Sequence, residues 1–321
     1  MLTGIVNRRW LGSAVAILTV LLVLPALVPL FYVYLLALIF VTALVAMSLN
    51  LALGYGGLFQ FHHAVFYGVG AYAVALTLTK TSLPAWVGFI AGPIAAAVVG
   101  LLIGWFCVRL TELYFGMLQI SLGSLIWAVV FRWYSFTGGD DGLHGIPIPS
   151  ILSPVNNSYY FILLIFVICL VALFIIVKSP FGATLQAIRD NPQRCEAIGV
   201  NVRRHQLLAI VIASFFAGVA GVLFVVLEHS VFPDLLFWVL SLEIFIMCLL
   251  GGWFTFLGPA VGAAMIVALR TFVGSYTEYW TLVLGVVLIL LIFFLPQGVL
   301  GYLLERFEPQ PEKAVAERGS K

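Results

Sequence analysis

Two adjacent carboxylates and an imidazole lie in the segment 134–159, YSFTGGDDGLHGIPIPSILSPVNNSY. Asp140, Asp141 and His144 are residue types that bind a cation or act in acid–base catalysis. Their spacing matches no metal-binding motif, and one short loop offers no scaffold to orient them. Alternatively, the backbone N–H groups of the preceding Thr-Gly-Gly could bind an anion as a nest. A third interpretation is a plain turn with no binding role. The residues of interest here are Thr137, Gly138, Gly139, Asp140, Asp141 and Gly142.

A second polar group interrupts an apolar stretch. Gln60, His62 and His63 stand between two hydrophobic runs. Ionisable residues within a membrane are functional candidates, although a buried histidine often only satisfies a neighbouring carbonyl group. An enzyme that combined these histidines with Asp140 and Asp141 would need both sets on one side of the membrane. The topology derived below places them on opposite sides, which disfavours an enzyme.

The elements that position these groups are hydrophobic helices. The chain is 63% hydrophobic and 9% charged, with a mean hydropathy of +1.17, whereas soluble domains carry about 25% charged residues. A helix needs about 20 apolar residues to cross a bilayer. The pattern predicts an all-α polytopic membrane protein with about ten transmembrane or partial helices. They are expected at 12–30, 32–53, 63–79, 84–107, 113–133, 160–177, 207–227, 236–250, 257–273 and 280–296.

The basic residues orient these helices. If the loop 178–206 is cytoplasmic, ten spans place both termini in the cytoplasm, and twelve of the fifteen Lys and Arg residues fall inside. Arg8-Arg9 before an apolar run resembles a signal peptide, but no convincing cleavage site follows, so a retained first helix is expected. We expect a permease domain at 1–304, which includes the cytoplasmic loop 178–206, and a polar cytoplasmic tail at 305–321. The four cysteines form no CxxC pair, so neither a disulfide framework nor a metal site is expected.

Two similar glycine breaks interrupt the apolar runs, GGLFQF at 56–61 and GGWFTF at 251–256. Non-helical backbone at membrane depth persists only inside protein or beside water, and matched breaks in two halves of a chain point to a transport pathway. Two ordinary cytoplasmic turns are the alternative. The pairs Gly100–Gly104 and Gly258–Gly262 are instead assigned to helix packing. The pathway candidates are Gly56, Gly57, Phe59, Gln60, Phe61, His63, Gly251, Gly252, Phe254, Thr255 and Phe256.

The loop 178–206 contains the signals of a short helix. Asn191 is a favourable N-cap, Pro192 suits the first helical position, and Gly199 suits the left-handed residue after the last turn. A helix of two turns is marginal by itself in water, so it needs a surface to dock against. Its charged residues suit a soluble partner, although an inner loop that is merely basic is the alternative.

The sequence RDNPQRCEAIGVNVRRHQLLAIVIASFFAGVAGVL around this loop resembles the coupling region of LivM-type permeases, the membrane subunits of branched-chain amino acid ABC importers. Similar blocks occur at 48–57, 63–72, 114–123, 137–147, 241–252, 257–264 and 295–301. The resemblance implies that the short helix fits a groove on an ATPase. The residues implied in coupling are Arg189, Asp190, Asn191, Pro192, Arg194, Glu196, Ala197 and Gly199.

The same resemblance implies a set of partners. These are a second, LivH-type permease chain, two cytoplasmic ABC ATPases and a periplasmic substrate-binding protein, in a bacterial inner membrane. The chain has no GxxxxGK[ST] phosphate loop, so ATP is expected on the partner subunits and no cofactor is expected here. No catalytic role and no nucleic-acid partner are expected. The breaks are hypothesised to form the gate, and the segment 137–142 to face the binding protein or the external mouth.

The glycine breaks depart from the family pattern. The family usually has GQLSLGHA after the first glycine, where this chain has GLFQFHHA, and GGLGSLLGP at the second break, where it has GGWFTFLGP. Bulky aromatic residues therefore replace small ones. Branched-chain or other hydrophobic amino acids remain the expected cargo. Urea, an aromatic compound or another small polar organic solute is the alternative, and a stand-alone secondary transporter is a further one.

Overall fold

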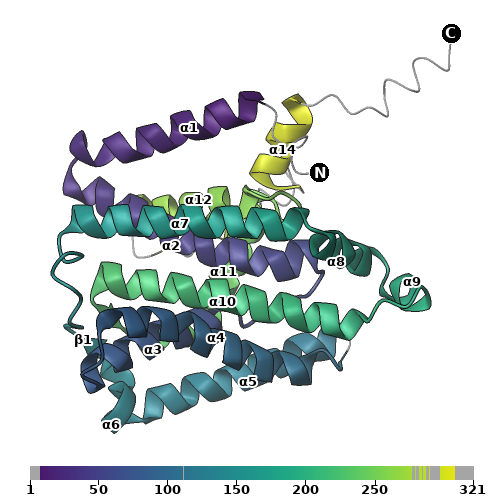
Figure 1. Cartoon of the computed structure of the whole chain (residues 1–321), viewed down its shortest axis with the longest axis horizontal. Coiled ribbons are helices and arrows are strands. Elements are labelled where there is room, and N and C mark those ends of the chain that lie inside the picture. The colour runs from purple at the N-terminus through teal and green to yellow at the C-terminus, as the bar shows by residue number, and fades with distance from the viewer. Residues whose placement is uncertain are drawn as a thin grey trace.

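The structure is a computed structural model that describes residues 8–110, 112–276 and 297–307, with isolated positions between 279 and 289. Within these residues the protein is a bundle of helices whose long members run side by side (Figure 1). Among the described residues, five helices are long and apolar enough to cross a membrane. The prediction of an all-α polytopic membrane protein is confirmed.

Eight of the ten predicted spans, from 32–53 to 257–273, match observed helices to within about five residues at each end. The long ones are α2 (Leu30–Asn50), α4 (Ala85–Cys107), α5 (Glu112–Arg132), α7 (Val155–Lys178) and α10 (Val202–Glu228). The π-helical turn η2 (Leu51–Tyr55) extends α2. The shorter helices are α3 (Ala64–Lys80), α11 (Trp238–Gly251) and α12 (Gly258–Gly274), and α14 (Gly298–Phe307) follows later. The predicted span 280–296 lies largely outside the described residues.

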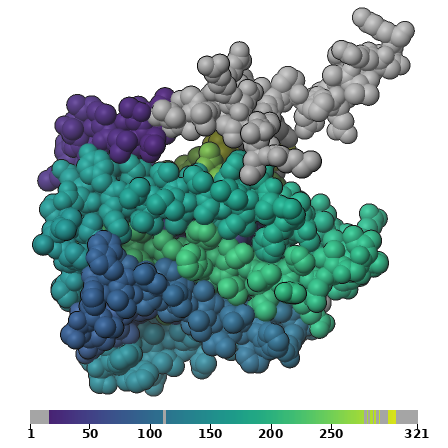
Figure 2. All heavy atoms as spheres, viewed as in Figure 1, coloured from purple at the N-terminus to yellow at the C-terminus, as the bar shows by residue number. Residues whose placement is uncertain are grey.

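The prediction of a single first span at 12–30 is wrong. Helix α1 (Arg8–Val23) ends before Pro25, which lies in the 3-10 turn η1 (Leu24–Ala26), and Pro29 is the N-cap residue of α2. Proline has no backbone N–H and restricts the residue before it, so two prolines this close divide the run. Helix α1 lies along the outer edge of the molecule (Figures 1 and 2). The hydroxyl of Tyr159 on α7 donates to the carbonyl of Leu21 at 2.9 Å and secures its end.

Small residues bring α3, α4 and α10 into close contact. A Cβ added at Gly70 would lie 2.5 Å from the Cα of Gly218, and one added at Gly100 would lie 2.2 Å from the hydroxyl of Ser214. A Cβ added at Gly262 would lie 1.9 Å from the carbonyl oxygen of Met247 on α11. The two GxxxG pairs therefore serve helix packing, as predicted.

The two ends of the bundle differ. One end holds α6 (Tyr134–Thr137), η3 (Gly139–Asp141) and a short antiparallel pairing of β1 (Leu143–His144) with β2 (Ser230–Val231), and η4 (Pro233–Leu236) follows. The other end holds α8 (Pro180–Asp190) and α9 (Pro192–Ala197). These features lie at opposite ends of the long helices (Figure 1). The sequence predicted α9 but not α8 as a separate helix.

Candidate functional site

The two glycine breaks, which are 195 positions apart, contact each other in the folded chain. The first break follows η2 and is separated from α3 by His62 and His63, and the second connects α11 to α12. The side-chain amide of Asn50 donates to the carbonyl of Thr255 at 3.2 Å. The backbone N–H of Ala64, the first residue of α3, donates to the hydroxyl of Ser241 at 3.0 Å. The second break is therefore held partly by α2, and the start of α3 by α11.

Glycine is required at these contacts. Gly57 has a φ of +67° and Gly252 a φ of +109°, which L side chains rarely adopt. A Cβ added at Gly54, two residues before the first break, would lie 2.1 Å from the carbonyl oxygen of Trp253. The glycines allow both the change of direction and the close approach of the two segments.

A buried chain of polar side chains supports the first break. The hydroxyl of Ser48 on α2 lies 2.9 Å from Nε2 of His63, and Nδ1 of His63 lies 2.8 Å from Oε1 of Gln60. All three side chains have no exposed surface. Buried polar groups are stable when they are hydrogen-bonded. This series of hydrogen bonds therefore fixes the conformation of residues 60–63 between α2 and α3.

The aromatic residues of the two breaks lie in two places. Phe59 stacks with Phe61 at 6.2 Å between ring centroids and lies 6.4 Å from Trp253 of the second break. Phe254 is 58% exposed and its ring lies 5.1 Å from that of Trp253, whereas Phe256 packs at 5.3 Å on Phe174 of α7. Phe59, Phe61, Trp253 and Phe254 therefore form one aromatic cluster across the two breaks, and Phe256 lies apart from it. A gate role for these residues stays a prediction.

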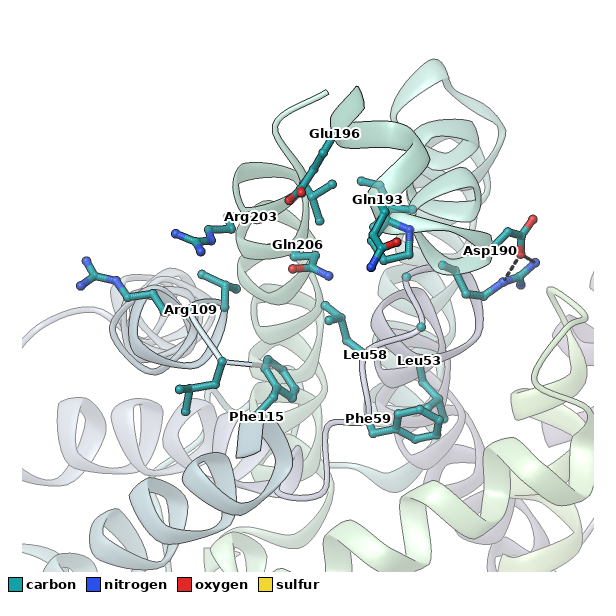
Figure 3. Close-up of a pocket in the computed structure, with 18 of the residues that line it drawn as sticks. Leu53, Leu58, Phe59, Arg109, Phe115, Asp190, Gln193, Glu196, Arg203 and Gln206 are labelled. Carbon is teal, nitrogen blue, oxygen red and sulfur yellow. Dashed lines mark hydrogen bonds and ion pairs between the residues drawn. The ribbon is translucent and has the colours of Figure 1, made fainter. Parts of the chain in front are cut away.

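A cleft of about 930 Å³ opens between the breaks and the loop that carries α8 and α9. Leu53 and Phe59 lie deep in it, Arg109 and Arg203 lie on one side, and Asp190 lies on the other (Figure 3). Gly56, Gly57, Trp253 and Phe254 also line the cleft. Both breaks thus face the same opening as the predicted coupling loop.

Arg189, at the end of α8, connects the loop to both breaks. Its Nη1 donates to the carbonyl of Gly54 at 2.6 Å, and its guanidinium lies 5.2 Å from the ring centroid of Phe254. A Cβ added at Gly57 would lie 2.8 Å from the Arg189 side chain, so this residue also packs on the first break. Its Nη2 and Nε bond to Asp190, which orients the planar group.

Helix α9 has the predicted capping. The side chain of Asn191 accepts from the backbone N–H of Arg194 at 2.9 Å, and Pro192 occupies the first helical turn. Gly199 has a φ of +88°, which suits the left-handed residue after the last turn. Cys195 is buried and packs with Ile188 and Val202, whereas Arg194 and Glu196 are exposed. One face of α9 thus holds the helix to the bundle and the other faces outward.

Comparison with known proteins identifies the family. Residues 31–292 match the family described as branched-chain amino acid transport system / permease component. The chain belongs to this permease family. The permease is 25% identical over 284 residues to the branched-chain amino acid permease protein LivM of Escherichia coli, covering 80% of this chain and 67% of that protein.

Two further relatives extend the comparison. The permease is 24% identical to LivH of Salmonella typhimurium, covering 81% of this chain and 91% of that protein. It is also 24% identical to the probable LivM of Methanocaldococcus jannaschii, covering 80% and 89% respectively. No solved structure matches the chain. The protein is thus a multi-pass membrane permease subunit of the ABC importer class, as the sequence predicted.

The predicted loop residues lie at the opposite end of the permease from the breaks. The hydroxyl of Tyr134 donates to Asp141, and this hydrogen bond raises the pKa of Tyr134. The N–H of Gly138 donates to the carbonyl of Tyr134 at 3.2 Å, and the N–H of Gly139 to the hydroxyl of Thr137 at 3.4 Å. Two amides of the possible anion nest are therefore already bonded. Among the described residues, no group of His, Cys, Asp and Glu is arranged to hold a metal.

Several residues at the breaks were not predicted. Asn50 contacts Thr255 of the second break, and Phe245 on α11 contacts Phe61 of the first. Trp253 lies within the predicted segment 251–256 but was not named as a candidate. Asn50 is a polar residue at the end of an apolar run, which is a detectable signal in the sequence. Nothing in the sequence distinguishes Phe245 from other apolar residues of α11, because its role depends on its contact with Phe61 in the folded permease.

Proposed function

We propose that this permease moves branched-chain or other apolar amino acids into the cytoplasm with energy from ATP hydrolysed by partner subunits. The proposed assembly contains a LivH-type second permease chain, two cytoplasmic ATPases and an external binding protein. It lies in a bacterial inner membrane with both termini of this chain in the cytoplasm. The cargo follows the names of relatives that transport branched-chain amino acids.

The contacts of Arg189 support the proposal that the ATPases are coupled to the glycine breaks. A guanidinium that bonds to Gly54 and lies over the ring of Phe254 joins the helix before α9 to both breaks. Movement of α9 by an ATPase would be transmitted to the breaks through this side chain. A binding partner shifts a conformational equilibrium only when it binds the two conformations with different affinity. In this proposal, closure of the ATPases on ATP gives them a different affinity for the two conformations of the permease.

The exposed rings favour one alternative cargo. Phe59, which is 41% exposed, and Phe254 both line the cleft, where a planar aromatic solute would find stacking partners. Urea lacks an apolar surface and gains little from such a wall. An apolar amino acid remains the first proposal, and an aromatic compound is the second.

The substitution Arg189→Ala tests the coupling. The complete assembly, with its ATPases and binding protein, is reconstituted in vesicles, and leucine uptake and ATP hydrolysis are measured together. We expect uptake per ATP hydrolysed to fall about tenfold or more, because the interactions with Gly54 and Phe254 are lost together. The ATPases should still co-purify, because the exposed face of α9 is unchanged.

Arg204→Ala is the matched control, since Arg204 is an exposed arginine in the first turn of α10 and does not line the cleft. It should leave uptake per ATP unchanged. Normal uptake per ATP in Arg189→Ala would refute transmission through this side chain. Gradient-driven leucine transport by the isolated chain, with no ATPase present, would refute the importer proposal itself.

A further inference from the structure

One face of α5 lies against the first break. A Cβ added at Gly116 would lie 2.7 Å from the ring of Phe61, and one added at Gly123 would lie 2.5 Å from the ring of His62. Gly116 and Gly123 are two helical turns apart, so the contact extends along the helix. The ring of His62 therefore lies on the backbone of α5 near the middle of this helix.

Polar atoms without hydrogen-bond partners gather along this contact. Both ring nitrogens of His62, Oε1 of Gln119 and Nε1 of Trp127 are buried and unpartnered in the described structure. His62 has no exposed surface and Gln119 has 1%. Gln119, Gly123 and Trp127 are spaced by four residues and form one row on the helix, so His62 on Gly123 lies between the other two. We call His62, Gln119 and Trp127 the α5 seam.

The composition of α5 also sets it apart from a lipid-facing helix. Among the five long spans, α5 has the lowest hydropathy, 1.7, and the smallest buried share, 22%. By comparison, α7 has a hydropathy of 3.4 and a buried share of 33%. If lipid surrounds a helix, a larger exposed share of that helix should go with a higher hydropathy. Helix α5 shows the reverse, as expected for a helix that borders protein or a water-filled path.

The unpartnered groups define a ligand chemistry. The carbonyl oxygen of Gln119 accepts a hydrogen bond, the indole of Trp127 donates one, and the imidazole of His62 does either. Leaving such groups buried and unpaired destabilises a protein, so a solute that pairs with them is favoured. No Asp, Glu, Lys or Arg occurs in the break or in α5 between its terminal Glu112 and Arg132. Nothing on the seam would compensate a net charge.

Aromatic rings flank the polar groups. Trp127 lies 5.0 Å from both Phe131 and Phe237 between ring centroids, and Phe61 lies 5.7 Å from Phe245. We propose that the α5 seam is a solute-binding track for a molecule without net charge that has both hydrogen-bonding groups and an apolar part. A zwitterionic amino acid with an apolar side chain fits this description. Urea has the polar groups without the apolar part.

This inference rests on the proposed transport function, so the test must separate the two. The full assembly is reconstituted in vesicles, and uptake of radiolabelled leucine and of urea is measured. Gln119→Leu removes the acceptor, and Trp127→Phe removes the N–H while keeping a ring. We expect leucine uptake to fall about tenfold in Gln119→Leu and several-fold in Trp127→Phe. ATP hydrolysis stimulated by the binding protein and the melting temperature should stay near wild-type values.

Ser121→Leu is the matched control, because Ser121 lies on the exposed side of α5 and bonds only to the carbonyl of Met117 in its own helix. It should transport leucine at the wild-type rate. If the wild-type assembly takes up leucine and both seam variants do so equally well, the α5 seam is not the track. Uptake of urea in preference to leucine would overturn the solute class. Absence of any ATP-driven uptake by the wild type would instead refute the proposed function.

Discussion

At the scale of single residues, the first break depends on a hydrogen-bonded chain and not on its glycines alone. Ser48, His63 and Gln60 are fully buried and bonded in series, through the Ser48 hydroxyl, both ring nitrogens of His63 and Oε1 of Gln60. Removing one partner leaves another buried group without a hydrogen bond, which costs more than the bond itself contributes. The conformation of the break is thus set from α2, fifteen positions earlier in the chain.

Ser48→Ala tests this dependence. We expect it to destabilise the permease by about 1–3 kcal/mol, because Nε2 of His63 loses its partner in the interior. The measurement is thermal unfolding in detergent. Ser121→Ala is the control, since both serines also bond to a carbonyl of their own helix but only Ser48 contacts a histidine. A decrease of equal size in both variants would contradict the prediction.

Residue-level prediction from the sequence succeeded where a local rule applied. The N-cap at Asn191 and the left-handed Gly199 follow from neighbouring residues alone, and both are confirmed. Gln60 and His63 were identified as unusual because they interrupt an apolar run. Their partner Ser48, and the contacts of Arg189 with Gly54 and Phe254, depend on segments far apart in sequence, and no local pattern reports them.

At the scale of elements, the shortness of α9 is its important property. It has six residues, and its ordered conformation depends on its cap and on the buried Cys195. By contrast, α10 has 27 residues and packs along much of its length. Loss of an N-cap costs about 0.5–2 kcal/mol in either helix, but only the short helix has little else to stabilise it.

Asn191→Ala and Asn201→Ala form a matched pair. Each asparagine accepts from the backbone N–H three residues later, at 2.9 Å in α9 and 3.0 Å in α10. We expect Asn191→Ala to weaken co-purification with the ATPases and to lower stimulated ATP hydrolysis several-fold. Asn201→Ala should leave both near wild type. Equal effects of the two variants would show that docking does not depend on the ordered α9.

The boundaries of elements were predictable to different degrees. Apolar length located α4 and α5 to within one residue at each end, because lipid imposes a nearly fixed helix length. The first predicted span was wrong because its length was given more weight than Pro25 and Pro29, and each proline removes a helical hydrogen bond. Helix α8 was missed since its polar residues resembled a loop, although Ser179 caps it and Pro180 starts it.

At the scale of the whole molecule, the two halves of the chain meet at their breaks. The contacts of Asn50 with Thr255 and of Phe59 with Trp253 join segments about 200 positions apart. The similar sequences GGLFQF and GGWFTF indicated two related segments, but not that they touch. If transport requires the halves to move relative to each other, this contact must change during the cycle.

Linking the two breaks tests this requirement. Phe59→Cys and Trp253→Cys are combined, because both residues line the cleft and their rings lie 6.4 Å apart. The four native cysteines are buried and are retained. A short, reducible thiol crosslinker should stop leucine uptake by the reconstituted assembly, while the ATPases remain bound. Reduction should restore uptake to the level of the untreated double variant, and each single-cysteine variant treated alike should be unaffected. Full uptake with the crosslink in place would mean that the breaks stay together throughout transport.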